Sequence, residues 1–145
     1  MKPKAAFLAG SIILTLSLGA NLLGHHAVTG FYDPQKTVML TGVVTRFDWA
    51  NPHAFIYIDV KDEMGNVYNW ALEGNGPGRL SRTGWKKDTL KRGDVITAEA
   101  WLPRATADVA GTLKATPQAA DRLKTAKLAH AREVTINGSK LAFGR

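Results

Sequence analysis

The adjacent histidines at positions 25 and 26 are the residues of this chain with the clearest capacity for chemistry. Together with a third imidazole from His53, they could bind copper, zinc or nickel, and Asp33 is the nearby carboxylate that could complete the ligand set. Cleavage of the chain just before His25 would also expose an α-amine, which could chelate one copper ion with the imidazole. The sequence therefore offers a metal site at His25, His26 and His53 as one hypothesis.

His53 also has a structural interpretation. It follows Asn51-Pro52, which favours a turn because proline has no N–H for a strand ladder. An imidazole at such a position usually finds a hydrogen-bond partner. We therefore also consider that His53 hydrogen-bonds to the backbone and holds the shape of the loop.

The sequence contains no arrangement typical of an enzyme. Cysteine is absent, which excludes thiolate catalysis and cysteine-based zinc sites. Ser81 and Ser139 lie in no Gly-x-Ser-x-Gly elbow. No two carboxylates can be placed on opposite sides of a cleft, as glycoside hydrolysis requires. We therefore expect no catalysis and no cofactor, apart from copper or zinc if the histidines bind a metal.

Aromatic side chains and one short loop form the second candidate site. Rings on a strand could stack against a sugar or an aromatic ligand, although alternation turns about half of them inward. The loop at residues 51–53 adds an amide and an imidazole. The predicted ligand-binding residues are Trp49, Asn51, His53, Tyr57, Trp70 and Trp85.

A β-meander over residues 37–72 is expected to position these residues. Strands are predicted at 38–49, 54–61 and 67–72, with Ile56, Ile58 and Val60 on one face of the second strand. Gly42 inside the first strand suggests a bulge or a sharp bend.

The second half of the chain mixes helix and strand signals. Residues 73–93 are rich in glycine and charge, with room for one short helix at 79–83, and a strand is predicted at 95–101. Thr116 followed by Pro117 is typical of a helix start, and the alanine-rich sequence through Arg132 continues that pattern. Strands at 133–136 and 141–143 joined by Asn137-Gly138 predict a final hairpin.

The predicted order of elements gives the fold class. It is mainly β, a small five- to six-stranded barrel like the oligonucleotide/oligosaccharide-binding (OB) fold, with one short helix between the third and fourth strands. A small open β-sandwich is the alternative. The predicted divisions are a signal peptide or membrane anchor at 1–24, an exposed lead-in at 25–36, and the barrel at 37–145 with a helical or flexible insertion at 104–129.

The N-terminus indicates export. Lys2 and Lys4 precede an uncharged, mostly apolar stretch at 5–24, with the best cleavage positions after Gly19 or Ala20. The stretch is also long enough to remain as an anchor, since a helix spans a bilayer with about 20 residues. The formal charge of +7 suits solubility and weak attraction to anionic surfaces.

Several motifs resemble those of a bacterial exported family of unknown function. They are His25-His26, Asp33-Pro34, Leu40-Thr41-Gly42-Val43-Val44-Thr45, Trp49-Ala50-Asn51-Pro52-His53, Trp70, Gly84-Trp85, Leu90-Lys91-Arg92-Gly93-Asp94-Val95 and Gly138. The resemblance covers most of the exported chain and departs from the family at about 108–128. It implies an exported, barrel-like domain and no established activity.

The sequence favours an exported, non-catalytic binding module for a small molecule or an envelope protein, located in the periplasm or at the inner membrane. Nucleic acid is not an expected partner, because export removes it from reach. The alternatives are a periplasmic copper- or zinc-binding protein that uses His25 and His26, and an assembly subunit anchored by residues 5–24.

Overall fold

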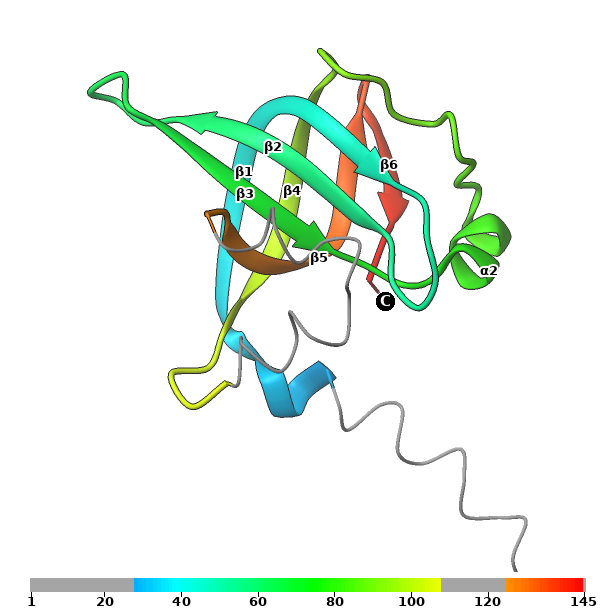
Figure 1. Cartoon of the computed structure of the whole chain (residues 1–145), viewed down its shortest axis with the longest axis horizontal. Helices are drawn as coiled ribbons and strands as arrows, with labels where there is room; N and C mark the ends of the chain where they lie inside the picture. The colour runs from blue at the N-terminus through cyan, green and yellow to red at the C-terminus, as the bar shows by residue number, and fades with distance from the viewer. Residues whose placement is uncertain (1–27, 108–124, 145) are drawn as a thin grey trace, which may run out of the picture.

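The computed structural model describes residues 28–107 and 125–144, which form a β-barrel (Figure 1). Its strands are β1 (Tyr32–Asp48), β2 (Phe55–Lys61), β3 (Val67–Glu73), β4 (Val95–Pro103), β5 (Lys127–Ile136) and β6 (Ser139–Ala142). A helical turn at 28–31 precedes β1, and α2 (Pro77–Leu80) with the 3-10 helix η1 (Ser81–Thr83) follows β3. The predicted signal or anchor at 1–24, His25, His26 and most of the insertion at 104–129 lie outside the described residues.

The barrel closes through one parallel pairing. Strand β1 pairs antiparallel with β2 and β4, β2 pairs with β3, and β4 pairs with β5. The parallel contact of β3 with β5 completes the ring, and β6 is an additional strand on β5. With α2 between β3 and β4, this order confirms the predicted OB-like barrel.

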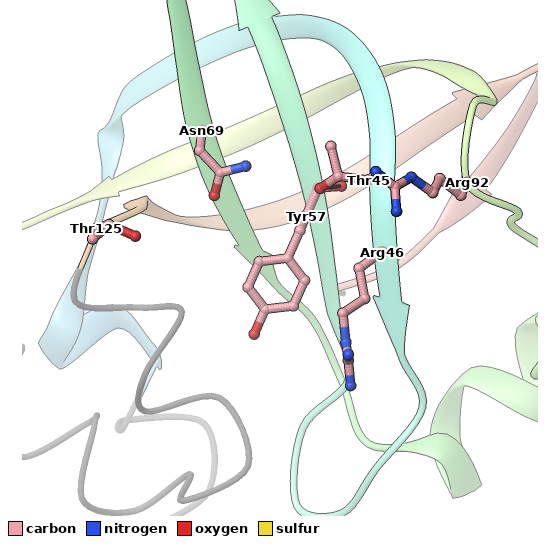
Figure 2. A pocket seen from close by; sticks show the side chains of 6 residues that line it. All are labelled: Thr45, Arg46, Tyr57, Asn69, Arg92 and Thr125. Atoms are coloured by element: carbon pink, nitrogen blue, oxygen red, sulfur yellow. Dashed lines mark hydrogen bonds between the residues drawn. The ribbon is translucent and has the colours of Figure 1, made fainter.

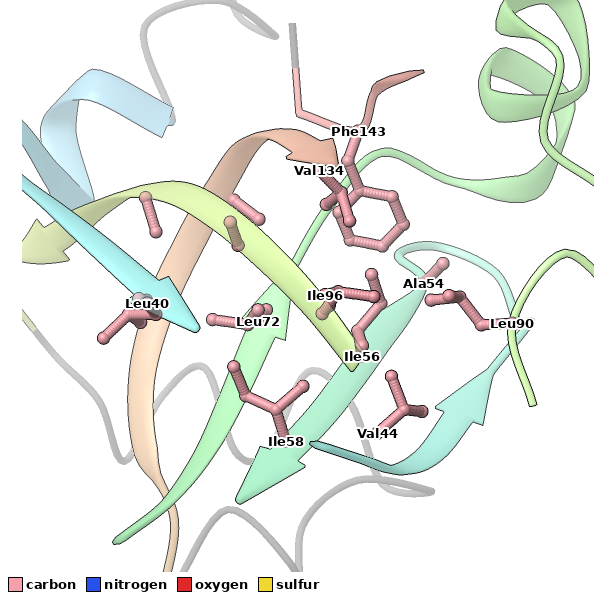
Figure 3. Packing of buried hydrophobic residues seen from close by; sticks show 14 of the residues in the cluster. Leu40, Val44, Ala54, Ile56, Ile58, Leu72, Leu90, Ile96, Val134 and Phe143 are labelled. Carbon is pink, nitrogen blue, oxygen red and sulfur yellow. The ribbon is translucent and has the colours of Figure 1, made fainter. Parts of the chain in front are cut away.

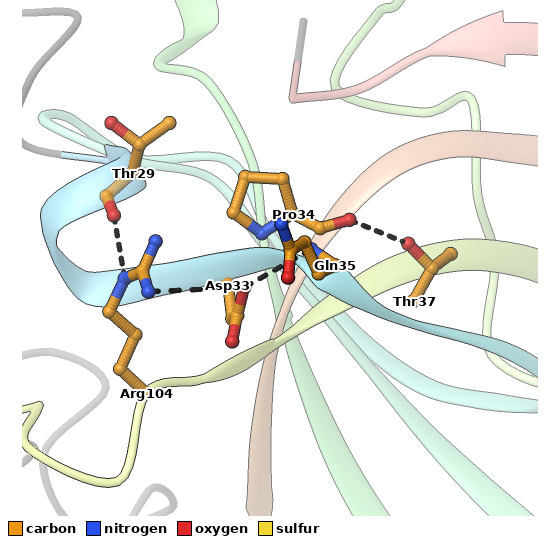
Figure 4. A network of polar contacts seen from close by, with 6 residues as sticks. All are labelled: Thr29, Asp33, Pro34, Gln35, Thr37 and Arg104. Carbon is orange, nitrogen blue, oxygen red and sulfur yellow. Dashed lines mark hydrogen bonds and ion pairs between the residues drawn. The ribbon is translucent and has the colours of Figure 1, made fainter.

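Strand β1 begins at Tyr32, earlier than the predicted start at Val38, so the end of the expected lead-in is part of the sheet. Its pairing with β4 is irregular between Asp33 and Thr37, where the Thr37 hydroxyl donates to the Pro34 carbonyl at 3.2 Å (Figure 4). The predicted turn at Asp33-Pro34 is thus a bulge within a long strand. A second register shift lies between Val44 and Arg46 rather than at Gly42.

Arg104 ties the end of β4 to the segment before β1. Its Nε donates to the Thr29 carbonyl at 2.9 Å (Figure 4). Its backbone N–H donates to the Phe31 carbonyl at 2.8 Å. Its guanidinium also lies 3.9 Å from the Asp33 carboxylate. Asp33, considered above as a metal ligand, therefore faces a cation.

The last hairpin confirms the predicted turn, with Asn137 and Gly138 at φ 50° and 79°. The predicted helix continuing to Arg132 is wrong from Lys127 onward, because those residues belong to β5. Ala129 and Ala131 are fully buried there, and pairing with β3 and β4 outweighs their helix propensity.

The barrel interior is a single apolar core that draws on every strand and on the segment after η1 (Figure 3). Its largest members include Trp85, Phe143, Ile56, Ile58, Leu72, Leu80, Ile96, Val44 and Val134. Within the described ranges, no helix is long and apolar enough to cross a membrane.

A second apolar cluster lies on the opposite, outer face of β2 and β3. It contains Tyr32, Phe55, Tyr57, Ala71 and Leu128, with Val28, Phe31, Trp101 and Ala126 packed against them. Because of this cluster, β2 is buried on both faces over residues 55–58, whereas the alternation in its sequence predicted one buried face.

Candidate functional site

The loop between β1 and β2 presents His53 at the surface. The peptide bond between Asn51 and Pro52 is cis, and the Pro52 carbonyl lies so close to Gly76 that a Cβ there would approach it to 2.5 Å. This close contact fixes the loop against the start of α2. The side chain of His53 remains 44% exposed.

His53 is held by a buried carboxylate rather than by the backbone. Its Nδ1 donates to Oε1 of Glu73, which is at the end of β3 and only 6% exposed. The hydroxyl of Tyr32, from the start of β1, donates to the other oxygen, Oε2. Glu73 thus joins the beginning of the barrel to the loop that carries His53.

His130 completes this group, which we call the polar cluster: Tyr32, His53, Glu73 and His130. His130 stands opposite Glu73 in the parallel β3–β5 pairing, and the Tyr32 ring centroid lies 5.1 Å from its own. Its Nε2 donates to the Gly144 carbonyl at 3.0 Å. Its Nδ1 is buried and has no hydrogen-bond partner in the described structure.

The charges of the polar cluster follow from these contacts. Burial raises the pKa of Glu73, but hydrogen bonds from His53 and Tyr32 outweigh it and hold that pKa below its ordinary value. The hydrogen bond to Glu73 raises the pKa of His53, against the opposing effect of burial. Burial lowers the pKa of His130, which favours its neutral form. These shifts favour an ion pair between Glu73 and His53 beside a neutral His130.

We expect the ion pair to give a pH-dependent contribution to the free energy of unfolding. The raised pKa of His53 means that its contribution is complete below pH 6.5 and is lost as the pH rises through the folded-state pKa. The lowered pKa of Glu73 means that its contribution is complete above pH 4.5 and is lost in more acidic buffer. His130 acts oppositely to His53, because its lowered pKa removes stability as the pH falls below 6.5.

A comparison of the wild type with His53→Gln separates the contribution of the Glu73–His53 ion pair from that of His130, because His130 is present in both proteins. Urea unfolding across a pH series should show the largest difference between pH 4.5 and 6.5, shrinking in alkaline buffer. A difference that stays constant with pH would contradict the ion pair.

A pocket of about 300 Å³, open to solvent, lies on the outer face of β1–β3. We call it the outer pocket; its lining residues are Thr45, Arg46, Tyr57, Asn69, Arg92 and Thr125 (Figure 2). Tyr57 connects it to the polar cluster, since the ring stacks on Phe55 at 6.2 Å and both belong to the second apolar cluster with Tyr32. The two features thus share one side of the barrel.

The predicted ligand-binding residues occupy three different environments. Tyr57 lines the outer pocket, and Asn51 and His53 lie exposed in the β1–β2 loop. Trp49 and Trp70 are half-buried and pack against the barrel core. Trp85 is 1% exposed inside that core, and its indole N–H donates to the Ala142 carbonyl at 2.8 Å.

The described part of the structure does not place the predicted metal ligands His25, His26 and His53 together. His53 faces Glu73, whereas His25 and His26 lie outside the described ranges. Within residues 28–107 and 125–144, no group of three or more histidine, cysteine, aspartate or glutamate side chains could hold a metal ion.

The site residues predicted from the sequence did not include Tyr32, Glu73 or His130. A signal was present, because Glu73 follows the apolar pair Ala71-Leu72 and His130 lies between two alanines. A polar residue within an apolar strand usually needs a buried partner.

Comparison with known proteins identifies the family of this chain. Searches of the curated proteins and of the solved structures found no match. A family model described as a family of unknown function (DUF6152) matches residues 13–113. The resemblance to an uncharacterised family is therefore confirmed, and the chain belongs to this family of unknown function.

Proposed function

We propose that this protein is an exported, non-catalytic binding module whose outer pocket takes a small ligand. The observation that carries the proposal is the cavity of about 300 Å³, which is within the usual size range of small-molecule sites. It lies on the face of the second and third strands, which OB folds use to bind ligands. The proposed export rests on Lys2, Lys4 and the uncharged stretch at 5–24.

The polar cluster supports this site without a catalytic role. Glu73 is buried, and both of its oxygens are engaged by Tyr32 and His53, so the carboxylate is not open to a substrate. A protein partner in the envelope would meet the same side of the barrel at the exposed loop carrying Asn51 and His53.

Copper or zinc binding through His25 and His26 is the competing proposal. One observation favours His53 as an additional metal ligand. Metal-binding histidines usually donate their second ring N–H to a carboxylate, which orients the other nitrogen towards the metal. The contact of His53 Nδ1 with Glu73 is of this kind. A membrane-anchored assembly subunit is the further alternative, and it requires that residues 5–24 remain uncleaved.

We expect the protein recovered from the envelope to be stabilised by at least one compound of a panel containing glucose, glucose 6-phosphate, citrate and choline. Thermal unfolding with each compound measures this, because a ligand of the folded state raises the midpoint. Asn69→Ala removes an amide from the pocket wall and should weaken binding about three- to tenfold.

Asn66→Ala is the matched control, because the Asn66 amide also donates to an aspartate, Asp62, and does not line the outer pocket. Stabilisation that survives Asn69→Ala unchanged would place binding elsewhere. The intact mass and metal content of the same sample test the alternatives. A chain beginning at Ala20 or Asn21 without metal supports the binding module, one beginning at His25 with bound copper supports metal handling, and a full-length chain in the membrane fraction supports the anchored subunit.

A further inference from the structure

The outer pocket is basic, and we propose that its ligand is a small organic oxyanion, either a phosphate ester or a carboxylate. This inference rests on the proposed function, because it names the class of ligand for the same site. Two of the lining residues, Arg46 and Arg92, are cations, and none of the lining side chains is acidic.

Arg92 is held beside β1 by the backbone on its C-terminal side. The Gly93 N–H donates to the Val44 carbonyl at 2.8 Å, and the Val44 N–H donates to the Asp94 carbonyl at 2.8 Å. Gly93 has φ 95°, a left-handed conformation that glycine adopts without strain. The loop therefore returns to β1 at a fixed point and carries the guanidinium to the pocket (Figure 2).

The charge of Arg92 is not neutralised within the described part of the chain. No aspartate or glutamate there lies within salt-bridge distance of its guanidinium, and its side chain is exposed. An arginine positioned at a cavity with its charge uncompensated is suited to bind a carboxylate or a phosphate, whose oxygens match the fork of its N–H groups.

Arg46, the residue after Thr45 on β1, supplies the second cation. It stands opposite Tyr57 in the β1–β2 pairing, so its position on the pocket wall is fixed by the sheet. Its Nε is paired with Asp48, which orients the guanidinium. Since a guanidinium has five N–H donors, this ion pair leaves others to meet a ligand.

The neutral lining residues agree with an oxygen-rich ligand. Thr45 already donates its hydroxyl to the Tyr57 carbonyl at 3.2 Å, so we assign the neutral donor role to Asn69, whose amide has two N–H groups. One N–H of the Asn69 amide donates to Asp59 at 2.9 Å, which leaves the other for an oxygen of the ligand.

The volume indicates an organic ligand rather than an inorganic ion. A water molecule takes about 30 Å³ of liquid volume, so a cavity of about 300 Å³ is much larger than a phosphate or sulfate ion needs. A molecule the size of a sugar phosphate or a tricarboxylate would place its charged group on the arginines and its remainder against Tyr57 and Asn69.

The test is a calorimetric titration of the envelope-purified protein with glucose 6-phosphate, citrate and uncharged glucose. We expect at least one of the two anions to bind, glucose to bind far more weakly, and added salt to weaken the anion. Arg92→Gln should lower the anion affinity about tenfold or more, because it removes a charge-assisted hydrogen bond. Arg82→Gln is the matched control, since Arg82 is an exposed arginine of η1 that does not line the pocket.

The outcomes separate this inference from the proposed function. Glucose binding as tightly as the anions, with binding still sensitive to Asn69→Ala, would overturn the oxyanion and leave the binding module standing. Anion affinity that is unchanged in Arg92→Gln and insensitive to salt would likewise overturn it. Binding of none of the three compounds, with no stabilisation by any compound of the wider panel, would overturn both.

Discussion

Replacing Glu73 by alanine is expected to lower the free energy of unfolding by about 3 kcal/mol. The carboxylate accepts hydrogen bonds from Tyr32 and His53, and the Tyr32 side chain is almost fully buried. Its removal leaves a buried hydroxyl without an acceptor and the His53 imidazolium without its counter-charge. The cost of unsatisfied groups, more than the worth of the original contacts, sets this magnitude.

Urea unfolding at pH 6 measures the effect, because Glu73 and His53 are both charged in the folded protein there. Glu63→Ala is the matched control: Glu63 is an exposed carboxylate after β2, and its loss should cost less than about 0.5 kcal/mol. A double-mutant cycle with Tyr32→Phe should show coupling, since the two side chains share one hydrogen bond. A Glu73→Ala protein as stable as the control would refute the role assigned to the carboxylate.

The fold could be predicted where local signals coincide with the pairing of neighbouring strands. The breaks at Asn51-Pro52 and Gly65 separate the strands of the meander, and Asn137-Gly138 forms the last turn. Antiparallel neighbours joined by short loops need no information from distant parts of the chain. The OB-like order followed from these elements and the short helix after β3.

The start of β5 could not be predicted in the same way. Residues 127–132 have a composition that favours a helix, yet they pair with β3 on one side and β4 on the other. The parallel pairing joins segments far apart in sequence, and the small side chains of Ala129 and Ala131 suit the crowded interior that this closure creates. Tertiary contacts therefore decide a strand that local propensity opposes.

The same distinction between local signals and long-range contacts applies to the residues of the candidate site. His53 and Tyr57 were selected from the loop and the strand that carry them; His53 is exposed in the β1–β2 loop, and Tyr57 lines the outer pocket. Glu73 meets Tyr32 across 41 positions of sequence, and it faces His130 only because β3 and β5 are parallel neighbours. Arg92 reaches the pocket through backbone hydrogen bonds between a loop and β1. None of these contacts leaves a periodic trace in the sequence.

Gly42→Ala is the second substitution with a large expected effect, because the glycine lies where two strand backbones come close. A Cβ at this position would lie 2.6 Å from the Asp59 carbonyl oxygen and 3.1 Å from Cγ2 of Val60. The carbonyl belongs to β2 and cannot move without disturbing the β1–β2 pairing, which begins at Val43 and Asp59. We expect a loss of about 2 to 3 kcal/mol, as for other overpacked interior positions.

Gly78→Ala provides the matched control, because a Cβ on Gly78 would meet no heavy atom within 4 Å. Gly78 lies in α2, where alanine is the better helix former, so this variant should be as stable as the wild type or up to about 1 kcal/mol more stable. Urea unfolding of both variants measures the contrast. Equal stability of the two would mean that the β1–β2 contact at Gly42 relaxes freely. A selective loss in Gly42→Ala would show that the glycine is required for close approach of the strands that carry Tyr57 and Arg46 to the outer pocket.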